Sequence, residues 1–159
     1  MCLTTPKFTK RKVTWVVDSG ATIHCVNDLS CITRIYENHQ PVRIKVANNE
    51  TLIATVVGEC EVSLRDTTGR NHTITLHNVV YHKDFAQNLM SVRKLWRHNR
   101  ISTKFCDKSH MKCKHSGAVF PISHNGKGGY TSHTAHATSV DTDILHSRFG
   151  HCSSHRLEV

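Results

Sequence analysis

The chain has 159 residues, which is enough for one ordinary domain or for a small domain plus a fragment. Hydrophobic residues make up 38% of the sequence and aromatic residues 6%, so the expected core is small, and no apolar run approaches the roughly 20 residues of a membrane span. The net charge of +9 is spread along the chain without a dense basic tract, so nucleic-acid binding is permitted but not indicated.

Cysteine usage and the N-terminal residues bear on the compartment. The seven cysteines are an odd number, scattered without any CxxC pair, which removes the strongest zinc signature. No secretory apolar segment follows Met1. We therefore expect a soluble protein with reduced thiols in a cytosolic setting.

The N-terminal part of the chain carries the first candidate site. Residues 1–12 are polar and basic, and we expect them to form a flexible lead-in. Val13–Val17 is then an apolar, β-leaning run that leads directly into Asp18, Ser19 and Gly20. This order predicts a buried strand that delivers a carboxylate to a tight turn at the rim of the core. The tripeptide alone is a weak signal, because short runs of this kind commonly form turns.

A first hairpin is expected from residues 42–46, where apolar and basic residues alternate, and from the β-branched run 51–57. The turn between them consists of Ala47, Asn48, Asn49 and Glu50. Asparagine tolerates positive φ and favours two-residue hairpin loops, so this pattern predicts a hairpin with an exposed tip.

A second hairpin and a helix are expected next. Residues 59–65 and 73–81 alternate in character around the turn 66–69. The apolar residues of 88–96 are spaced as on one face of a helix, and Asn88 is its expected N-cap.

From residue 99 onward the pattern changes. We expect a strand at 101–105 and short β-like pieces around 118–122 and Tyr130. The Ser-, Thr- and His-rich stretch 131–142 is interpreted as a linker, and 143–157 as a segment compatible with a helix.

This order of elements resembles a retroviral-type aspartic protease, and its motifs resemble the copia-type LTR retrotransposon Gag-Pol polyprotein. Asp18-Ser19-Gly20-Ala21 with His24 is similar to the family's D-S-G-A-x-x-H. Residues 88–95 are similar to its N-L-x-S-V-x-x-L, preceded by a Val-Tyr strand end at 79–81. Residues 145–151 resemble W-H-x-R-L-G-H, which begins the pre-integrase region. Leu145 and Phe149 depart from the last pattern.

The resemblance implies an all-β, retropepsin-like closed fold with one short helix, as one monomer of a homodimer. A small β/α extension follows at the C-terminal end. The domains it implies are the lead-in 1–12, an aspartic protease domain at 13–99, and a pre-integrase region with the truncated start of an integrase zinc module at 100–159. The sequence is thus expected to be a polyprotein segment, or a decayed or truncated copy.

The function implied is that of an aspartic endopeptidase. Two carboxylates sharing one proton are needed, and the chain has a single D-S-G, so two copies of Asp18, Ser19 and Gly20 would meet in a homodimer. Ala47, Asn48, Asn49 and Glu50 are the expected tip of a substrate-covering flap. Residues 101–105 form either the dimer seam or a strand of the downstream region. The alternative function is a catalytically inactive remnant or domesticated module that binds protein or nucleic acid.

The expected partners and cofactors follow from the same resemblance. The protease itself needs no cofactor, and its substrate is its own Gag-Pol polyprotein, with no membrane involved. His146 and His151 are the candidate zinc ligands, but their site is completed only when the downstream integrase module is present. The implied location is cytoplasmic, in a virus-like particle, and nuclear for an integrase-linked form.

Overall fold

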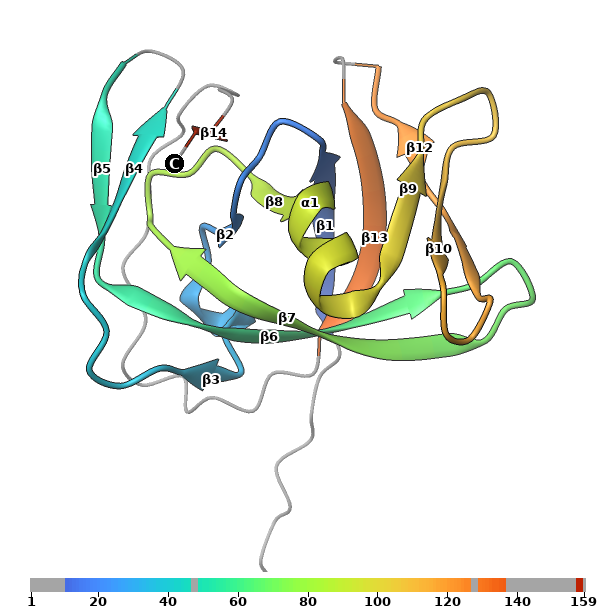
Figure 1. Ribbon diagram of the computed structural model, residues 1–159, viewed down its shortest axis with the longest axis horizontal. Helices are drawn as coiled ribbons and strands as arrows, with labels where there is room; N and C mark the ends of the chain where they lie inside the picture. Colours follow the sequence, from blue (N-terminus) through green and yellow to red (C-terminus); the bar gives the residue numbers. More distant parts are fainter. Residues whose placement is uncertain (1–10, 47–48, 127–128, 137–156, 159) are drawn as a thin grey trace, which may run out of the picture.

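The computed structural model describes residues 11–46, 49–126, 129–136 and 157–158. Strands dominate these residues, and helical structure is confined to short segments (Figure 1). The strands are β1 (Arg11–Asp18), β2 (His24–Val26), β3 (Arg34–Ile35), β4 (Val42–Val46), β5 (Thr51–Ala54), β6 (Val56–Arg65), β7 (Asn71–Tyr81), β8 (Asn88–Ser91), β9 (Ile101–Lys104), β10 (His110–Cys113), β11 (Val119–Pro121), β12 (Ser123–His124), β13 (Tyr130–His136) and β14 (Leu157–Glu158). The helical segments are η1 (Leu29–Cys31), α1 (Val92–Lys94) and η2 (Leu95–Asn99).

The main sheet closes on itself. Its strand order is β12-β13-β1-β8-β2-β7-β6-β3, and β13 also pairs with β6. Six strands, from β13 through β1, β8, β2 and β7 to β6, therefore form a closed ring, which leaves fewer free edges than an open sheet. The predicted fold class, an all-β, retropepsin-like closed fold with one short helix, is confirmed.

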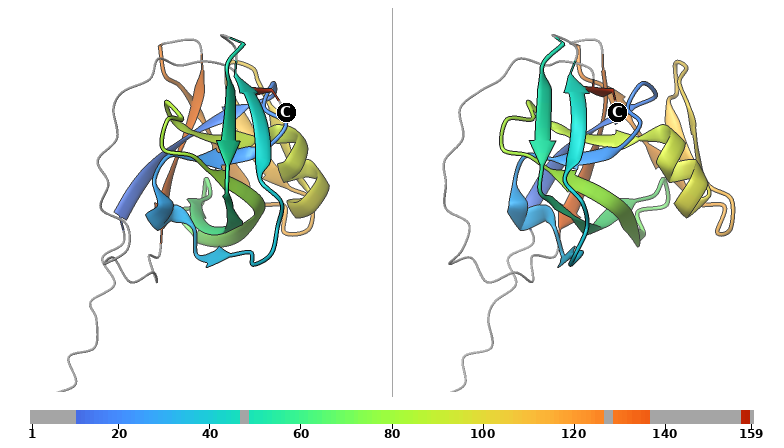
Figure 2. Two further views of the ribbon diagram at one scale, coloured as in Figure 1. Left: turned by 90° about the vertical axis from the view of Figure 1, so that its left-hand side faces the viewer. Right: turned by 60° about the vertical axis from the view of Figure 1, so that its left-hand side comes forward.

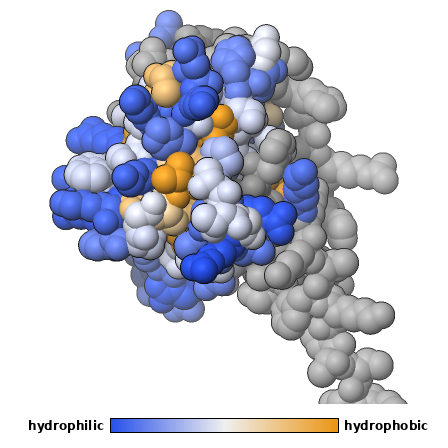
Figure 3. Space-filling model, turned by 90° about the vertical axis from the view of Figure 1, so that its right-hand side faces the viewer, coloured by the Kyte–Doolittle hydropathy of each residue, from blue (hydrophilic) through white to orange (hydrophobic). Residues whose placement is uncertain are grey.

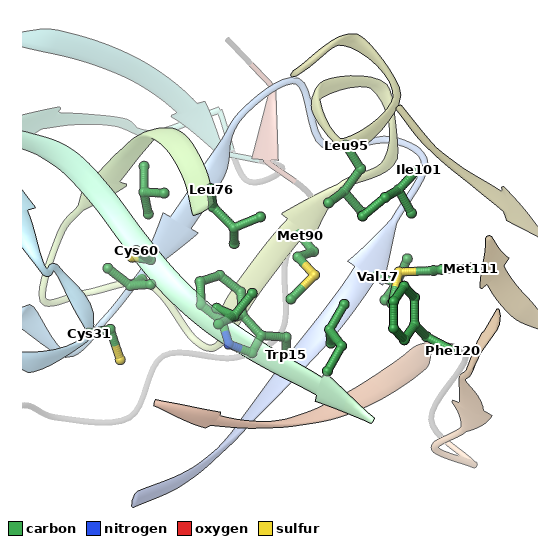
Figure 4. Close-up of a cluster of buried hydrophobic side chains, with 14 of the residues drawn as sticks. Trp15, Val17, Cys31, Cys60, Leu76, Met90, Leu95, Ile101, Met111 and Phe120 are labelled. Atoms are coloured by element: carbon green, nitrogen blue, oxygen red, sulfur yellow. The ribbon is translucent and has the colours of Figure 1, made fainter. Parts of the chain in front are cut away.

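The core is organised by β1, which is buried on both faces. Trp15 and Val17 lie in the larger apolar cluster, together with Met90 of β8 and Leu76 of β7 (Figure 4). Val16 points the other way, into a second cluster that includes residues of β2, β4 and β5. Because successive side chains of a strand alternate, two adjacent clusters share this one strand.

The first predicted hairpin is confirmed as β4–β5, with a different turn. The N–H of Asn49 donates to the carbonyl of Val46 (2.9 Å), and the N–H of Val46 donates to the carbonyl of Glu50 (3.0 Å). Asn49 has a φ of +66° and is therefore in the left-handed conformation. A residue in this conformation closes a three-residue loop, whereas the sequence predicts a two-residue loop. The predicted strand 51–57 is divided at Thr55 between β5 and β6. Ala47 and Asn48 lie outside the described residues.

The second predicted hairpin is confirmed as β6–β7 and is the longest in the molecule's described part. Its turn is built on Asp66, whose Oδ1 accepts the backbone N–H groups of Thr68 (2.8 Å) and Arg70 (3.0 Å). Gly69 adopts φ of +88° in this turn, a conformation that side chains rarely allow. The hydroxyl of Thr68 donates to the Asp66 carboxylate, and these bonds hold the pKa of Asp66 below its ordinary value.

The predicted helix at 88–96 is wrong in its first half. Residues 88–91 form strand β8, and all four are buried. A strand buried on both faces has no period-2 alternation, so consecutive apolar residues within it are easily taken for a helix. The helix begins only after Ser91, whose hydroxyl accepts the N–H of Lys94 and is the actual N-cap. Arg100, in the left-handed conformation, ends it.

The C-terminal part contains a second correction. Residues 131–136, which the composition predicts as linker, belong to β13, which pairs antiparallel with β1 from Arg11↔His136 to Val17↔Tyr130. The strand predicted at 101–105 is β9, at the edge of a three-stranded sheet with β10 and β11. Because Ile101, Met111 and Phe120 also enter the larger core cluster, packing is continuous across the predicted boundary at residues 99 and 100. Of the segment predicted to be compatible with a helix, 143–156 lies outside the described residues, and Leu157 belongs to β14.

The side of the molecule formed by β9 to β12 is mainly hydrophilic, with a small apolar area among polar and charged side chains (Figure 3). Phe105, which follows β9, is among the exposed large apolar residues. The centroid of its ring lies 4.8 Å from the ring centroid of Tyr130. Within the ranges described here, no helix has the length and hydropathy of a membrane span.

Gly58 gives a direct test of how β6 packs against β3. A Cβ at this position would lie 2.1 Å from the backbone carbonyl oxygen of Arg34 and 2.8 Å from Cγ2 of Ile32, so the backbone must move. We expect Gly58→Ala to reduce the free energy of unfolding by about 2–3 kcal/mol, as measured by urea denaturation. Thr73→Ala on the exposed face of β7 is the control, and equal stability of the two variants would contradict this packing.

Candidate functional site

Asp18 is the last residue of β1 and stands at the point where the buried strand meets a turn. Residues 15–17 are buried, Asp18 is half-buried and Ser19 is exposed. The N–H of Gly20 donates to Oδ1 of Asp18 at 2.7 Å, a local bond that fixes the carboxylate over its own turn. The carboxylate is thus oriented by backbone and accessible at the end of the strand.

β8 lies parallel to β1 and places Ser91 directly beside Asp18 in the register. The Ser91 hydroxyl donates to the carbonyl of Ala21 at 2.7 Å, and the same oxygen accepts the N–H of Lys94 at 3.3 Å. Ser91 is completely buried. One side chain therefore ties the turn after Asp18 to the start of the helix.

His24 lies behind this turn, at the start of β2, and is completely buried. Its Nδ1 accepts the backbone N–H of Ser91 at 3.0 Å. Burial, with a smaller contribution from neighbouring Lys94, His98 and His77, lowers the pKa of His24 from 6.5 to about 3. The imidazole is therefore neutral at ordinary pH.

The opposite end of β8 is anchored by Asn88. Its Oδ1 accepts the N–H of Asn27 (3.1 Å), and its Nδ2 donates to the carbonyl of Thr14 on β1 (3.4 Å). Asn88 is thus a cross-link between the strands that flank β8, not the predicted N-cap. The polar residues at the two ends of Asn88-Leu89-Met90-Ser91 hold the strand, and the two apolar residues between them enter the two core clusters.

The β4–β5 hairpin and the turn that follows β1 project toward the same end of the barrel (Figures 1 and 2). Ile44 and Ala54 are buried in the second core cluster, so the hairpin is fixed through its strands and not only at its base. Asn49 and Glu50, the two predicted flap residues that the structure describes, belong to its turn. β14 pairs with the edge of β4 that β5 does not occupy.

The predicted metal ligands His146 and His151 lie outside the described residues. Among those described, no group of three or more histidine, cysteine, aspartate or glutamate side chains is arranged to hold a metal ion. The five described cysteines are free thiols. Burial raises the pKa of the Cys25 and Cys60 thiols, which makes them poor nucleophiles and metal ligands.

Sequence reasoning named Asp18 and Gly20 but missed the part played by Ser91. The signal was present, because Ser91 follows two apolar residues and precedes Val92, Arg93 and Lys94, which is the pattern of an N-cap. The helix predicted at 88–96 places Ser91 in its interior, where its hydroxyl would have no contact with the D-S-G turn.

Comparison with known proteins now identifies the family. The family model described as "Pol polyprotein, beta-barrel domain" matches residues 15–101, from the middle of β1 to the start of β9. The chain belongs to this family. The Pol beta-barrel domain is similar to the "Retrovirus-related Pol polyprotein from transposon RE1" of Arabidopsis thaliana, with 30% identity over 95 residues. It has the same identity over the same length with the polyprotein from transposon RE2 of that plant.

These matches cover 57% of this chain and 6% of each relative, so the domain spans only a small part of the curated polyproteins. No solved structure matches it. The predicted relation to a retrotransposon Pol polyprotein is confirmed at that level.

Ser91→Ala tests the link between the turn and the helix. The substitution leaves the carbonyl of Ala21 without its buried donor and removes the N-cap of α1, so we expect the free energy of unfolding to fall by about 2 kcal/mol. Ser102→Ala is the matched control, because Ser102 is exposed on β9. Chemical denaturation measures both variants, and a Ser91→Ala chain as stable as Ser102→Ala would contradict the assigned role.

Proposed function

We propose that this Pol beta-barrel domain is the aspartic endopeptidase of a copia-type retrotransposon, and that it cleaves its own Gag-Pol polyprotein as a homodimer. The observation that supports this most is the placement of Asp18. A half-buried carboxylate stands at the end of a core strand, held by the N–H of Gly20, in a turn that is itself bonded to β8.

The chemistry requires two such carboxylates about 3 Å apart, which cannot both ionise and therefore share one proton. The protonated side polarises the carbonyl of the scissile peptide bond. The ionised side takes a proton from the attacking water, which adds to the carbonyl carbon. Breakdown of the tetrahedral intermediate then returns a proton to the leaving amine.

A homodimer is proposed because these 159 residues contain one D-S-G, so the second Asp18 of the dyad comes from another copy. Each copy contributes Asp18, with Ser19 and Gly20 shaping the turn. The β4–β5 hairpin, with Ala47, Asn48, Asn49 and Glu50 at its tip, acts as the flap that covers the bound peptide and excludes water.

The polyprotein context adds further proposals. The protease is assigned to residues 13–99 and the pre-integrase region to residues 100–159. Strand β13 nevertheless belongs to the barrel that the protease residues form. The protease uses no cofactor, and His146 and His151 bind zinc only with ligands from the downstream integrase module. The location is a cytoplasmic virus-like particle, with a nuclear form when linked to the integrase.

Asp18→Asn tests the catalytic assignment, because asparagine is nearly isosteric with aspartate but cannot serve as the general base. We expect cleavage of a peptide library, followed by mass spectrometry and inhibited by pepstatin in the wild type, to fall by at least about 10³-fold. Circular dichroism and sedimentation should show an unchanged fold and dimer.

Asp107→Asn, an exposed aspartate after β9, makes the same chemical change away from the site and should retain full activity. Undiminished cleavage by Asp18→Asn would disprove the aspartic endopeptidase proposal. No cleavage by the wild-type protein would favour the alternative, an inactive remnant or a binding module.

Mixing the wild-type protein with Asp18→Asn tests whether the two carboxylates of one active site come from two different copies of the chain. If subunits exchange freely, an equimolar amount of the variant leaves only a quarter of the dimers wholly wild type. The activity of a fixed amount of wild type should then fall to about half. An activity that stays unchanged or rises on mixing, in a sample shown by sedimentation to contain heterodimers, would mean that a dimer with a single Asp18 is active.

A further inference from the structure

The Nδ1 atom of His24 can only be an acceptor in this fold. Its partner at 3.0 Å is the backbone N–H of Ser91, which can only donate. The proton of the neutral ring therefore lies on Nε2, and Nε2 is a buried atom without a hydrogen-bond partner among the described residues. This tautomer follows from the geometry of the backbone.

The bond from Ser91 to His24 is one of two that converge on the same residue. While its N–H points to β2, the Ser91 hydroxyl donates to the carbonyl of Ala21, the residue after the D-S-G turn, at 2.7 Å. Ser91 is also the register partner of Asp18. His24, Ser91 and Ala21 thus form a continuous chain of hydrogen bonds from the core to the turn that carries the carboxylate.

We propose that His24 is a positioning residue whose neutral imidazole holds Ser91 and, through it, the Asp18 turn, so that acid releases the turn by protonating His24. The part of this proposal that concerns catalysis rests on the proposed endopeptidase function. The part that concerns the turn does not, since it depends only on hydrogen bonds of the folded chain.

Protonation of His24 is incompatible with the closed turn, in which His24, Ser91 and Ala21 are hydrogen-bonded, for two reasons. A proton on Nδ1 would face the N–H of Ser91, so that two donors would meet where one bond now exists. The ring is also completely buried, and the groups that lower its pKa after burial itself are Lys94 from α1, His98 from η2 and His77 from β7. β8 contributes no titratable side chain to this environment, because it consists of Asn88, Leu89, Met90 and Ser91.

The direction of the pH effect follows from linkage. With the turn closed the pKa of His24 is about 3, whereas with the turn open the ring is solvated and its pKa is near 6.5. Between these values the open form binds the additional proton, so acid favours opening. The population of the open turn should rise about tenfold for each pH unit below 6.5.

This pH window can be separated from the acid sensitivity of Glu59 and Asp66. The hydrogen bond from Arg34 lowers the pKa of Glu59 from 4.5 to about 2, so the stabilisation from Glu59 is full above pH 4.5 and is lost only below it. Asp66, whose pKa is also lowered, behaves in the same way. Measurements between pH 6.5 and pH 4.5 therefore avoid both carboxylates.

Two variants of His24 distinguish positioning from simple packing. His24→Asn places an amide oxygen close to the position of Nδ1, where it can accept the N–H of Ser91 but cannot titrate. His24→Leu fills the space and offers no acceptor. The matched control is His82→Asn, because Nδ1 of His82 also accepts a backbone N–H, that of Asp84, at a separate loop.

The first measurement is hydrogen exchange at the Ser91 amide in the full chain carrying Asp18→Asn, which needs no activity. The protection factor should fall about tenfold per pH unit from pH 6.5 to pH 4.5 with His24, and should stay level with His24→Asn. The His82→Asn control should retain the full fall. A level profile with His24 present, or an equal fall in His24→Asn, would overturn the proposal.

The second measurement is cleavage of the peptide library by the active chain. We expect His24→Leu to lower kcat by about 10²-fold with KM within about twofold, because a displaced carboxylate impairs the chemical step rather than binding. His24→Asn should restore kcat near neutrality and extend activity to lower pH. The catalytic part of the proposal would be refuted if His24→Leu kept the full kcat. It would also be refuted if the activity of His24→Asn fell at low pH in the same way as that of the wild type.

If no variant and no wild-type sample cleaves the library, the proposed endopeptidase function fails and takes the catalytic part with it. The exchange experiment still decides the positioning role, since it is carried out without a substrate. The two failures are therefore distinguishable.

Discussion

The insertion of β8 between β1 and β2 is the constraint on which the rest of the structure depends. The strand is parallel to β1 on one edge and antiparallel to β2 on the other, and its four residues are buried. Parallel neighbours cannot be joined by a tight turn, so the chain must build β2 to β7 before it returns to this position. The β1–β8 pairing therefore joins residues more than 70 positions apart, and the site stands at its end.

Much of the fold was predictable because it obeys local rules. The strand before Asp18 and both hairpins follow from β-branched runs, alternation and turn residues, and all three are present. The strand at 88–91 was not predictable in this way, because a strand buried on both faces lacks alternation. The strand at 130–136 was hidden by its polar composition, although Ser132 within it is buried against β1. Its structure is imposed by the neighbours that pair with it, which composition does not reveal.

The candidate site was predictable only in part, for a related reason. Asp18 and Gly20 interact within one turn, so adjacent residues are enough to suggest their geometry. Ser91 and His24 are 67 positions apart, and their bond exists only because β8 and β2 are neighbours. A histidine six residues after the aspartate carries no sign of its tautomer in the sequence, whereas the direction of one backbone N–H in the structure determines it.

The closing strand β13 also sets a condition on synthesis and processing. It is the last strand of the ring in chain order, and it fills the gap between β1 and β6. A nascent chain that ends before residue 130 has a first strand with one open edge, exposing backbone groups and the tryptophan-centred core beneath it. Any cut in the polyprotein between residues 101 and 130 would separate the ring from its final member. The closed ring therefore extends past residue 101, where similarity to the barrel family ends.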